Sequence, residues 1–304
     1  MAERLGNTAI MQNAWKARTA IPAFNIPYLP MMEPVVRALH DTRSFGFIAV
    51  ARLEWIKFES GSLRDIYDEY QRVKDERFTR LHLDHVPVID EDQLVVDYMK
   101  DLTEAADMGY DSVMVDGSRL SLDENIAATR KVVEMAHARG IPVEAELGSI
   151  VGHEAGPMPP YEELFASGKG FTDPDEARRF VAETGVDWLS IAIGNIHGAI
   201  SSARKEKKTE ARLSIDRLDA ISTAVGIPLV LHGGTGIRKE HTLEAIRHGI
   251  AKINVATAIR QPYEALIGQS VEAAQDAVYD TMLELIRDEL ELENSVDAIC
   301  PQTD

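Results

Sequence analysis

Short apolar runs alternate with amphipathic segments along the chain, and this alternation is the strongest pattern in the sequence. The runs are rich in Val, Ile and Leu and are bounded by Gly, Asp or Pro. Because they are continuously apolar, they predict strands that are buried on both faces, as parallel strands covered by helices are. The predicted strands are residues 21–26, 45–53, 80–86, 111–118, 143–150, 188–195, 227–234 and 252–257.

The segments between these runs have the pattern and the end residues of helices. Asp173 and Pro174 are residue types that favour an N-cap and the first helical position. Glycines stand where left-handed C-caps would end helices, at Gly109, Gly140, Gly185, Gly226 and Gly249. The predicted helices are 92–108, 123–138, 174–184, 214–225 and 238–248, and a further helical pattern extends from 261 to about 292.

Strand and helix alternate eight times, which favours a closed (β/α)8 barrel of the TIM type over an open doubly wound sheet. The dinucleotide-binding form of the open sheet lacks support, because no Gly-x-Gly-x-x-Gly follows the first predicted strand. A chain of 304 residues with 45% hydrophobic composition is long enough for one such barrel. We therefore expect residues 1–304 to form a single α/β domain with a C-terminal helical extension at about 261–304.

The composition limits which binding partners and which cellular compartment we expect for this protein. The formal charge of −18 argues against nucleic acid, whose phosphates are bound by clustered Lys and Arg. The single cysteine, Cys300, excludes a disulfide framework and a Cys-based metal site. No stretch approaches the roughly 20 apolar residues of a membrane span, and the N-terminus lacks an apolar signal region. We expect a cytoplasmic protein with no membrane partner.

Polar side chains close several predicted strands, at the end of a barrel where catalytic residues gather. His85, His197 and His232 stand at the ends of three apolar runs, and Glu146 stands at the end of another. Three neutral imidazoles with one open position are typical of a catalytic zinc site. These residues are therefore the candidate metal ligands.

The turn after the seventh predicted strand is a candidate phosphate site. His232 is followed at 233–236 by Gly-Gly-Thr-Gly, directly before the helix predicted from 238. Such a turn directs several backbone N–H groups to one point, and the helix N-terminus also attracts anions. Asn254 and Thr257 on the eighth strand are expected beside it, because TIM barrels often bind phosphate around strands seven and eight.

At this level of detail the chain resembles the class II, metal-dependent fructose-bisphosphate and tagatose-bisphosphate aldolases, over roughly residues 21–260. The joint order and spacing of the shared motifs are highly specific. They are 23–25 (AFN), 83–85 (LDH), 115–118 (VDGS), 144–148 (EAELG), 172–174 (TDP), 194–198 (GNIHG), 231–236 (LHGGTG) and 252–257 (KINVAT).

The resemblance implies a ligand set and a binding pocket. The catalytic zinc would lie on His85, His197 and His232, with Glu146 near an alternate or second cation position. The family's substrate- and phosphate-binding positions correspond to Asn25, Gly198, Gly233, Thr235, Asn254 and Thr257.

Two carboxylates are implied as the proton-transfer groups. Asp84 would exchange a proton with the oxygen of the cleaved C–C bond, and Glu154 would remove a proton from the three-carbon donor. Deprotonating a carbon beside a carbonyl places negative charge on oxygen, which a Lewis-acidic metal stabilises. Glu154 lies in an unusually long connection, 153–170, which predicts a lid that closes after the substrate binds. The implied reaction makes or breaks a C–C bond in a ketose (bis)phosphate, with dihydroxyacetone phosphate as donor.

The chain departs from the family where the aldehyde acceptor should be recognised. After the second strand the family usually has a small, Ser- or Gly-rich stretch, whereas this chain has Arg52-Leu53-Glu54-Trp55. A lysine expected shortly after Gly198 is also absent. We therefore expect an acceptor other than glyceraldehyde 3-phosphate. Arg52 would bind a carboxylate, sulfonate or phosphate on it, or would instead pair with Glu54 or an aspartate of the chain.

Two other functions fit the same residues. One is a metal-dependent sugar-phosphate isomerase or epimerase, which uses the same enediolate chemistry without C–C cleavage. The other is a catalytically idle barrel that binds sugar phosphate, although the presence of Asp84 and Glu154 argues against it. The family resemblance also favours a homodimer or homotetramer.

Overall fold

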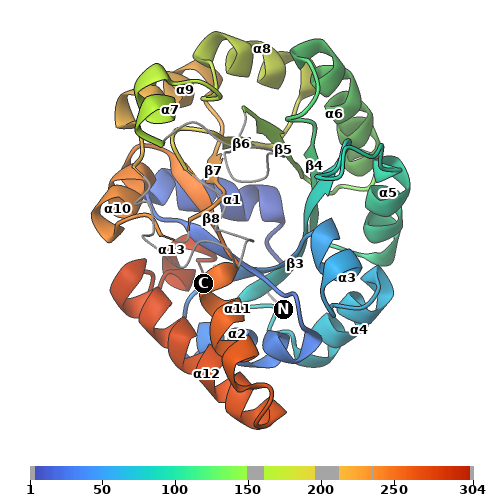
Figure 1. Ribbon diagram of the computed structural model, residues 1–304, viewed down its shortest axis with the longest axis vertical. Coiled ribbons are helices and arrows are strands. Elements are labelled where there is room, and N and C mark those ends of the chain that lie inside the picture. The colour runs from blue at the N-terminus through green and yellow to red at the C-terminus, as the bar shows by residue number, and fades with distance from the viewer. Residues whose placement is uncertain (1–3, 149–160, 196–211, 235, 302–304) are drawn as a thin grey trace.

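Eight parallel strands close into a barrel in the order in which they occur along the chain, and β1 pairs with both β2 and β8. The structure is a computed structural model that describes residues 4–148, 161–195, 212–234 and 236–301. Helices surround the barrel (Figure 1), so the predicted (β/α)8 fold is confirmed. The strands are β1 Ile21–Asn25, β2 Gly46–Val50, β3 Thr79–Pro87, β4 Ser112–Asp116, β5 Val143–Leu147, β6 Trp188–Ile191, β7 Leu229–Leu231 and β8 Ile250–Val255.

The helices cover the outer face of the barrel, and α1 crosses its N-terminal end. There the Asn7 side chain donates a hydrogen bond to the carbonyl of Asp111, directly before β4 (3.1 Å). The helices are α1 Asn7–Ala17, η1 Leu29–Met31, α2 Met32–Asp41, α3 Arg52–Lys57, α4 Leu63–Val73, α5 Tyr98–Met108, α6 Leu122–His137, α7 Tyr161–Ser167, α8 Pro174–Thr184, α9 Ile215–Val225, α10 Lys239–Arg247, α11 Thr257–Leu266, α12 Val271–Glu284, η2 Leu285–Glu289 and α13 Val296–Ile299.

Local sequence signals fix several helix ends. Asp173 accepts hydrogen bonds from the second and third residues of α8 through Oδ1 and is followed by Pro174, and Gly185 ends the helix in a left-handed conformation. Gly109 and Gly226 end α5 and α9 in the same way. Two of the five predicted C-caps were wrong. Ala138 and His248 are the C-caps of α6 and α10, and the predicted glycines follow them.

Most strands end earlier than the apolar runs suggested. The run at 45–53 gives a strand only to Val50, and α3 begins at Arg52. The reason is local: the Glu54 carboxylate accepts the backbone N–H of Ala51 (2.7 Å) and thereby caps the new helix. The helical pattern from 261 likewise divides into α11, which already begins at Thr257, and α12 and η2.

The barrel interior is apolar except for a group of buried charged and polar side chains. Every residue of β1, β2, β4 and β5 is buried, as expected for strands covered on both faces. Burying a charged group is costly unless it has a partner, so these residues require an explanation. They include His82, Asp84, Glu144, Glu146 and Lys252. Among the described residues, no helix is both long and apolar enough to cross a bilayer.

Gly117 offers a test of how tightly the barrel supports this interior. A Cβ at this position would lie 2.1 Å from Oδ1 of Asn125, whose Nδ2 donates to the carbonyl of Glu146 (3.0 Å). We expect Gly117→Ala to lower the free energy of unfolding by about 1–3 kcal/mol, measured by chemical denaturation. Gly268→Ala is the control, because nothing lies within 4 Å of its added Cβ, and we expect a change within about 0.5 kcal/mol. Equal effects of the two substitutions would contradict the close packing of Gly117 against Asn125.

Candidate functional site

Asp84 lies at the centre of the buried polar group and is only 3% exposed. Its Oδ2 accepts hydrogen bonds from the side-chain amides of Asn25 on β1 (2.9 Å) and Asn254 on β8 (2.8 Å). Its Oδ1 lies 3.6 Å from both Lys252 Nζ and His82 Nε2. Burial by itself would raise the pKa of this carboxyl, but Lys252 and His82 outweigh burial and hold it well below its usual range. Asp84 is therefore an ionised carboxylate in a fixed orientation.

His85, Glu146 and His232 form a cluster in which one ligand atom of each lies within 4.8 Å of the others. His232 Nε2 lies 2.8 Å from Oε1 of Glu144, while its Nδ1 faces Glu146 Oε2 at 3.8 Å. Metal-binding histidines commonly have one ring nitrogen held by a carboxylate in this way, while the other binds the ion. Two imidazoles and a carboxylate fit a zinc ion. The cluster thus contains three of the four predicted ligands, and the fourth, His197, lies outside the described residues.

A second carboxylate holds His85. Nε2 of His85 lies 2.7 Å from Oδ2 of Asp116 at the end of β4. Burial lowers the pKa of His85, but Asp116 raises it more, to about 10. The pKa of Asp116 is lowered in turn, although burial opposes the shift. Burial and the charge of Asp116 raise the pKa of Glu146 to about 8. This concentration of carboxylates favours a bound cation.

Lys252 neutralises the other side of the site. It lies in β8 with no exposed surface, and its Nζ is 2.8 Å from Oε2 of Glu144. Trp188 donates its indole N–H to the same carboxylate (2.7 Å). His82, Asp84 and Glu144 also have the spacing of a metal site, but the Lys252 ammonium already lies against both carboxylates. This second cluster is therefore compensated by a lysine of the chain.

His82 belongs to this network, although the alternation of side chains along the third predicted strand predicts that it lies outside the site of His85. The alternation of side chains along a strand places His82 and His85 on opposite faces. In the structure the register of β3 against β4 shifts between Leu83 and Val86, so the alternation does not extend to His85. His82 Nε2 lies 3.5 Å from Glu144, and its Nδ1 pairs with Ser112 Oγ (2.9 Å).

The predicted donor-binding residues lie around β7 and β8. Gly233 adopts a positive φ of 67°, and a Cβ on Gly234 would lie 2.8 Å from Ile253, which shows how closely the turn approaches β8. Asn254 is hydrogen-bonded to Asp84, and Thr257 is the first residue of α11. The other predicted site residues lie outside the described part of the chain: Glu154, Gly198 and Thr235.

Arg52 forms ion pairs within the chain, which is one of the two alternatives that the sequence left open. Its guanidinium lies 3.7 Å from Asp90 and 3.4 Å from Asp101, both beyond the C-terminal end of β3. The pairing that forms is therefore with aspartates rather than with Glu54. A role of Arg52 in binding the acceptor stays a prediction, which would require the guanidinium to leave these partners.

Glu54 is an acidic residue whose position the sequence did not reveal. It is 6% exposed, and the Asn25 amide, which donates to Asp84, lowers its pKa. Burial raises the pKa of Glu54 to about 8, assisted by the negative charge of Asp84 and opposed by Arg260. The sequence signal that could have identified Glu54 was an acidic residue in a stretch where the family usually has Ser or Gly. For Lys252 the corresponding signal was a charged residue inside an apolar strand.

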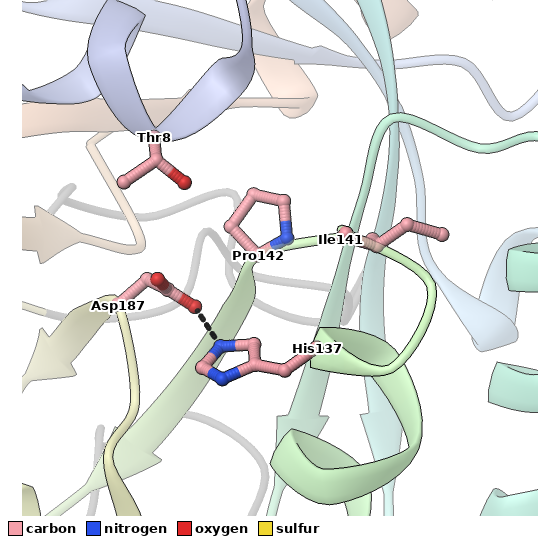
Figure 2. Close-up of a pocket in the computed structure, with 6 residues that line it drawn as sticks. Thr8, His137, Ile141, Pro142 and Asp187 are labelled. Carbon is pink, nitrogen blue, oxygen red and sulfur yellow. Dashed lines mark hydrogen bonds and ion pairs between the residues drawn. The ribbon is translucent and has the colours of Figure 1, made fainter.

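A surface hollow of about 260 Å³ lies at the opposite end of the barrel and is not part of this site. Pro142 and Asp187 in its lining directly precede β5 and β6 (Figure 2). Nε2 of His137 pairs with Oδ2 of Asp187 (2.8 Å), which also accepts the backbone N–H of Val143 at the start of β5 (2.7 Å). These contacts tie α6 to the start of β5, which is a structural role.

Comparison with known proteins agrees with this arrangement. Residues 7–298 match the family model described as "Fructose-bisphosphate aldolase class-II". A fructose-bisphosphate aldolase of Streptococcus pyogenes serotype M3 is 41% identical over 178 residues, which cover 58% of this chain and 52% of the relative. One of Staphylococcus aureus is 43% identical over 154 residues, covering 51% and 49%. The chain therefore spans about half the length of the curated relatives that it matches.

Similarity to a solved structure extends over nearly the whole chain. The YdjI aldolase from Escherichia coli K12 superposes with a TM-score of 0.74 at 26% identity, covering 96% of this chain and 99% of that one. The fructose-bisphosphate aldolase of Campylobacter jejuni, at 18% identity and a TM-score of 0.73, supports the fold alone.

Removing the buried ammonium should leave two buried carboxylates without their counter-ion. We expect Lys252→Met to lower the free energy of unfolding by about 3–5 kcal/mol, measured by denaturant titration. Lys239→Met is the control, because Lys239 pairs with Glu291 at the surface, and we expect a much smaller loss of stability than for Lys252→Met. A loss below about 1 kcal/mol for Lys252→Met would show that Lys252 does not compensate the buried charges of Asp84 and Glu144.

Glu54 should make the stability depend on pH. Its pKa is raised from 4.5 to about 8 by burial, with Asp84 on β3 adding to the shift and Asn25 on β1 and Arg260 on α11 opposing it. The raised pKa means that its stability contribution is complete below pH 4.5 and is lost as the pH rises towards 8. We expect the Glu54→Gln variant to gain stability relative to wild type over this window, by on the order of 2–5 kcal/mol in chemical denaturation.

Glu124→Gln is the matched control for this measurement. Glu124 caps α6 as Glu54 caps α3, but it is exposed and its pKa is lowered by Ser121. The control variant should therefore lack the gain between pH 4.5 and 8. A flat difference between Glu54→Gln and wild type across this range would contradict the buried state of Glu54.

Proposed function

Because the chain belongs to the class-II fructose-bisphosphate aldolase family, we propose that it is a metal-dependent aldolase acting on a ketose phosphate. It makes or breaks a C–C bond, with dihydroxyacetone phosphate as the donor. The observation that carries this proposal is the ionised Asp84 held beside the cluster of His85, Glu146 and His232. The S. pyogenes and S. aureus relatives are named fructose-bisphosphate aldolases, and the whole-chain likeness to YdjI adds a third aldolase.

The metal we propose is zinc, held by His85 and His232, with Glu146 as an alternate or additional ligand. His197 completes the set by the family resemblance. When bound, the ion supplies Lewis acidity that stabilises negative charge on the substrate oxygens. Glu144 holds His232 in position through the 2.8 Å contact at Nε2. A second divalent or monovalent cation is part of the same proposal.

Asp84 moves the proton of the bond-breaking step. In cleavage it accepts the proton of the hydroxyl whose oxygen becomes the aldehyde carbonyl, and the electrons of the broken C–C bond pass to the donor half. In synthesis it returns that proton to the new hydroxyl. Its ionised state leaves the carboxylate open to a proton, and the two amides of Asn25 and Asn254 fix it in the required direction.

The remaining roles follow from the family resemblance. Glu154 removes the proton from the donor, and Gly198, Gly233, Thr235, Asn254 and Thr257 bind the donor and its phosphate. The left-handed turn at Gly233 and the N-terminus of α11 at Thr257 support the phosphate role, since both direct backbone N–H groups outward. We further propose a single-domain cytoplasmic enzyme that assembles as a homodimer or homotetramer.

Metal removal tests the proposed reaction class. The purified chain, incubated with dihydroxyacetone phosphate and a panel of aldehydes, should form products whose mass equals donor plus aldehyde. A chelator should abolish this activity, and added zinc should restore it, because the enediolate then has its stabilising cation. Full activity after metal stripping would exclude the metal-dependent mechanism. A product of unchanged carbon number would instead indicate an isomerase or epimerase.

Asp84→Asn separates the proton transfer from metal binding. We expect kcat to fall by about 10²–10⁴, because the amide cannot accept the hydroxyl proton. Bound zinc, measured by elemental analysis, should stay at the wild-type stoichiometry. The control is Asp219→Asn on α9, where the carboxylate pairs with His248 at the surface. A kcat within threefold of wild type in Asp84→Asn would contradict the role of Asp84.

A further inference from the structure

Glu54 is a buried carboxyl that the proposed mechanism does not use. It lies on the first turn of α3, directly beyond the C-terminal end of β2, and is 6% exposed. This residual exposure is close to that of Asp84 (3%) and Glu146 (2%), which border the site. The Asn25 amide that donates to Asp84 also lowers the pKa of Glu54, and the charge of Asp84 raises it, so this carboxyl lies close to the proton-transfer group.

Helix capping alone does not explain the burial of Glu54. Its Oε2 accepts the backbone N–H of Ala51, three residues earlier. Asp65 in α4 and Glu124 in α6 make the same contact with the backbone N–H groups of Ser62 and Ser121, yet both are exposed. A cap therefore works at the surface, where the carboxylate keeps its hydration. Placing Glu54 inside the barrel mouth carries a desolvation cost that capping does not require.

The charges around Glu54 favour a hydroxyl as its ligand over a phosphate. The guanidinium groups of Arg52, two residues before Glu54, and of Arg260, whose charge lowers the pKa of Glu54, already have carboxylate partners. Arg52 pairs with Asp90 and Asp101, and Nη1 of Arg260 lies 2.6 Å from both oxygens of Glu264. A phosphate placed against Glu54 would find both of these cations already paired, whereas a carboxyl oxygen readily accepts a hydrogen bond from a hydroxyl.

The position of Glu54 also indicates which half of the substrate it faces. The donor phosphate pocket of the proposed function lies around β7 and β8, while Glu54 approaches Asp84 from the end of β2. Under that function, Asp84 exchanges its proton with the aldehyde oxygen. A group beside Asp84 on the β2 side therefore faces the aldehyde half.

We propose that Glu54 is a specificity-determining residue that hydrogen-bonds a hydroxyl group on the aldehyde half of the substrate. This inference rests on the proposed aldolase function. It assigns acceptor recognition to Glu54, while Arg52 holds α3 against the segment that follows β3.

The test compares two three-carbon aldehydes that differ in their hydroxyl groups, D-glyceraldehyde and propionaldehyde. The zinc-loaded full chain is assayed with saturating dihydroxyacetone phosphate, and kcat/KM is measured for each aldehyde. We expect wild type to prefer glyceraldehyde by at least about tenfold, as a hydrogen bond to a buried carboxyl predicts. Glu54→Ala should reduce this ratio at least about tenfold, mainly by slowing glyceraldehyde.

Glu54→Gln keeps an acceptor for the Ala51 N–H and therefore keeps the start of α3. At a pH above about 8, where Glu54 is ionised, this variant should lower the ratio by about three- to tenfold, because a neutral amide makes a weaker hydrogen bond than a carboxylate. Glu124→Gln and Glu124→Ala are the matched controls for the loss of a helix cap, and both should keep the wild-type ratio. A ratio within twofold of wild type in every folded Glu54 variant would overturn the proposal, as would a wild type that does not discriminate.

Exchange of the donor proton separates failure of this inference from failure of the proposed function. With dihydroxyacetone phosphate alone in deuterium oxide, a class II aldolase incorporates deuterium without any aldehyde. If wild type shows no metal-dependent exchange, the proposed function itself fails. If exchange stays normal in Glu54→Ala and the aldehyde ratio also stays unchanged, only the role of Glu54 fails.

Discussion

The contact between Lys252 and the carboxylates of Glu144 and Asp84 is the interaction on which the candidate site depends. A buried ammonium and a buried carboxylate are each costly alone, and together they offset much of that cost. The consequence is chemical as well as structural. Because Lys252 keeps Asp84 ionised, the barrel presents a base before any substrate arrives, and because it keeps Glu144 ionised, His232 has a fixed partner.

The same pairing divides the buried carboxylates into two groups. Asp84 and Glu144 are compensated within the chain by Lys252, whereas Glu146 and Asp116 lie beside the imidazoles of His232 and His85. Under the proposed function, this second group is the one that would attract an external cation. Lys252 would then keep the metal from being drawn to Asp84, because its ammonium already lies against that carboxylate.

The sequence predicted the fold well because its signals are local. Continuous apolar runs, Asp173-Pro174 and the C-cap glycines each depend on a few neighbouring residues. The site was harder, because it depends on contacts between distant strands. His82 was misplaced since a register shift in β3 breaks the alternation of side chains, and nothing in the sequence shows which carboxylate Lys252 meets. Arg52 was ambiguous for the same reason, because its partners follow another strand.

The architecture also explains why one of the departures from the family falls after β2. The network around Asp84 draws its polar side chains from β1, β3, β5 and β8 and from the end of β7, and among the described residues β2 supplies none of them. A change in β3 or β8 would disturb a buried ion pair. A change beyond Val50 leaves that ion pair in place, and Glu54 lies there close enough to Asp84 for the two charges to interact. Under the proposed function, substrate choice would therefore diverge at this position while the metal site and Asp84 stay unchanged.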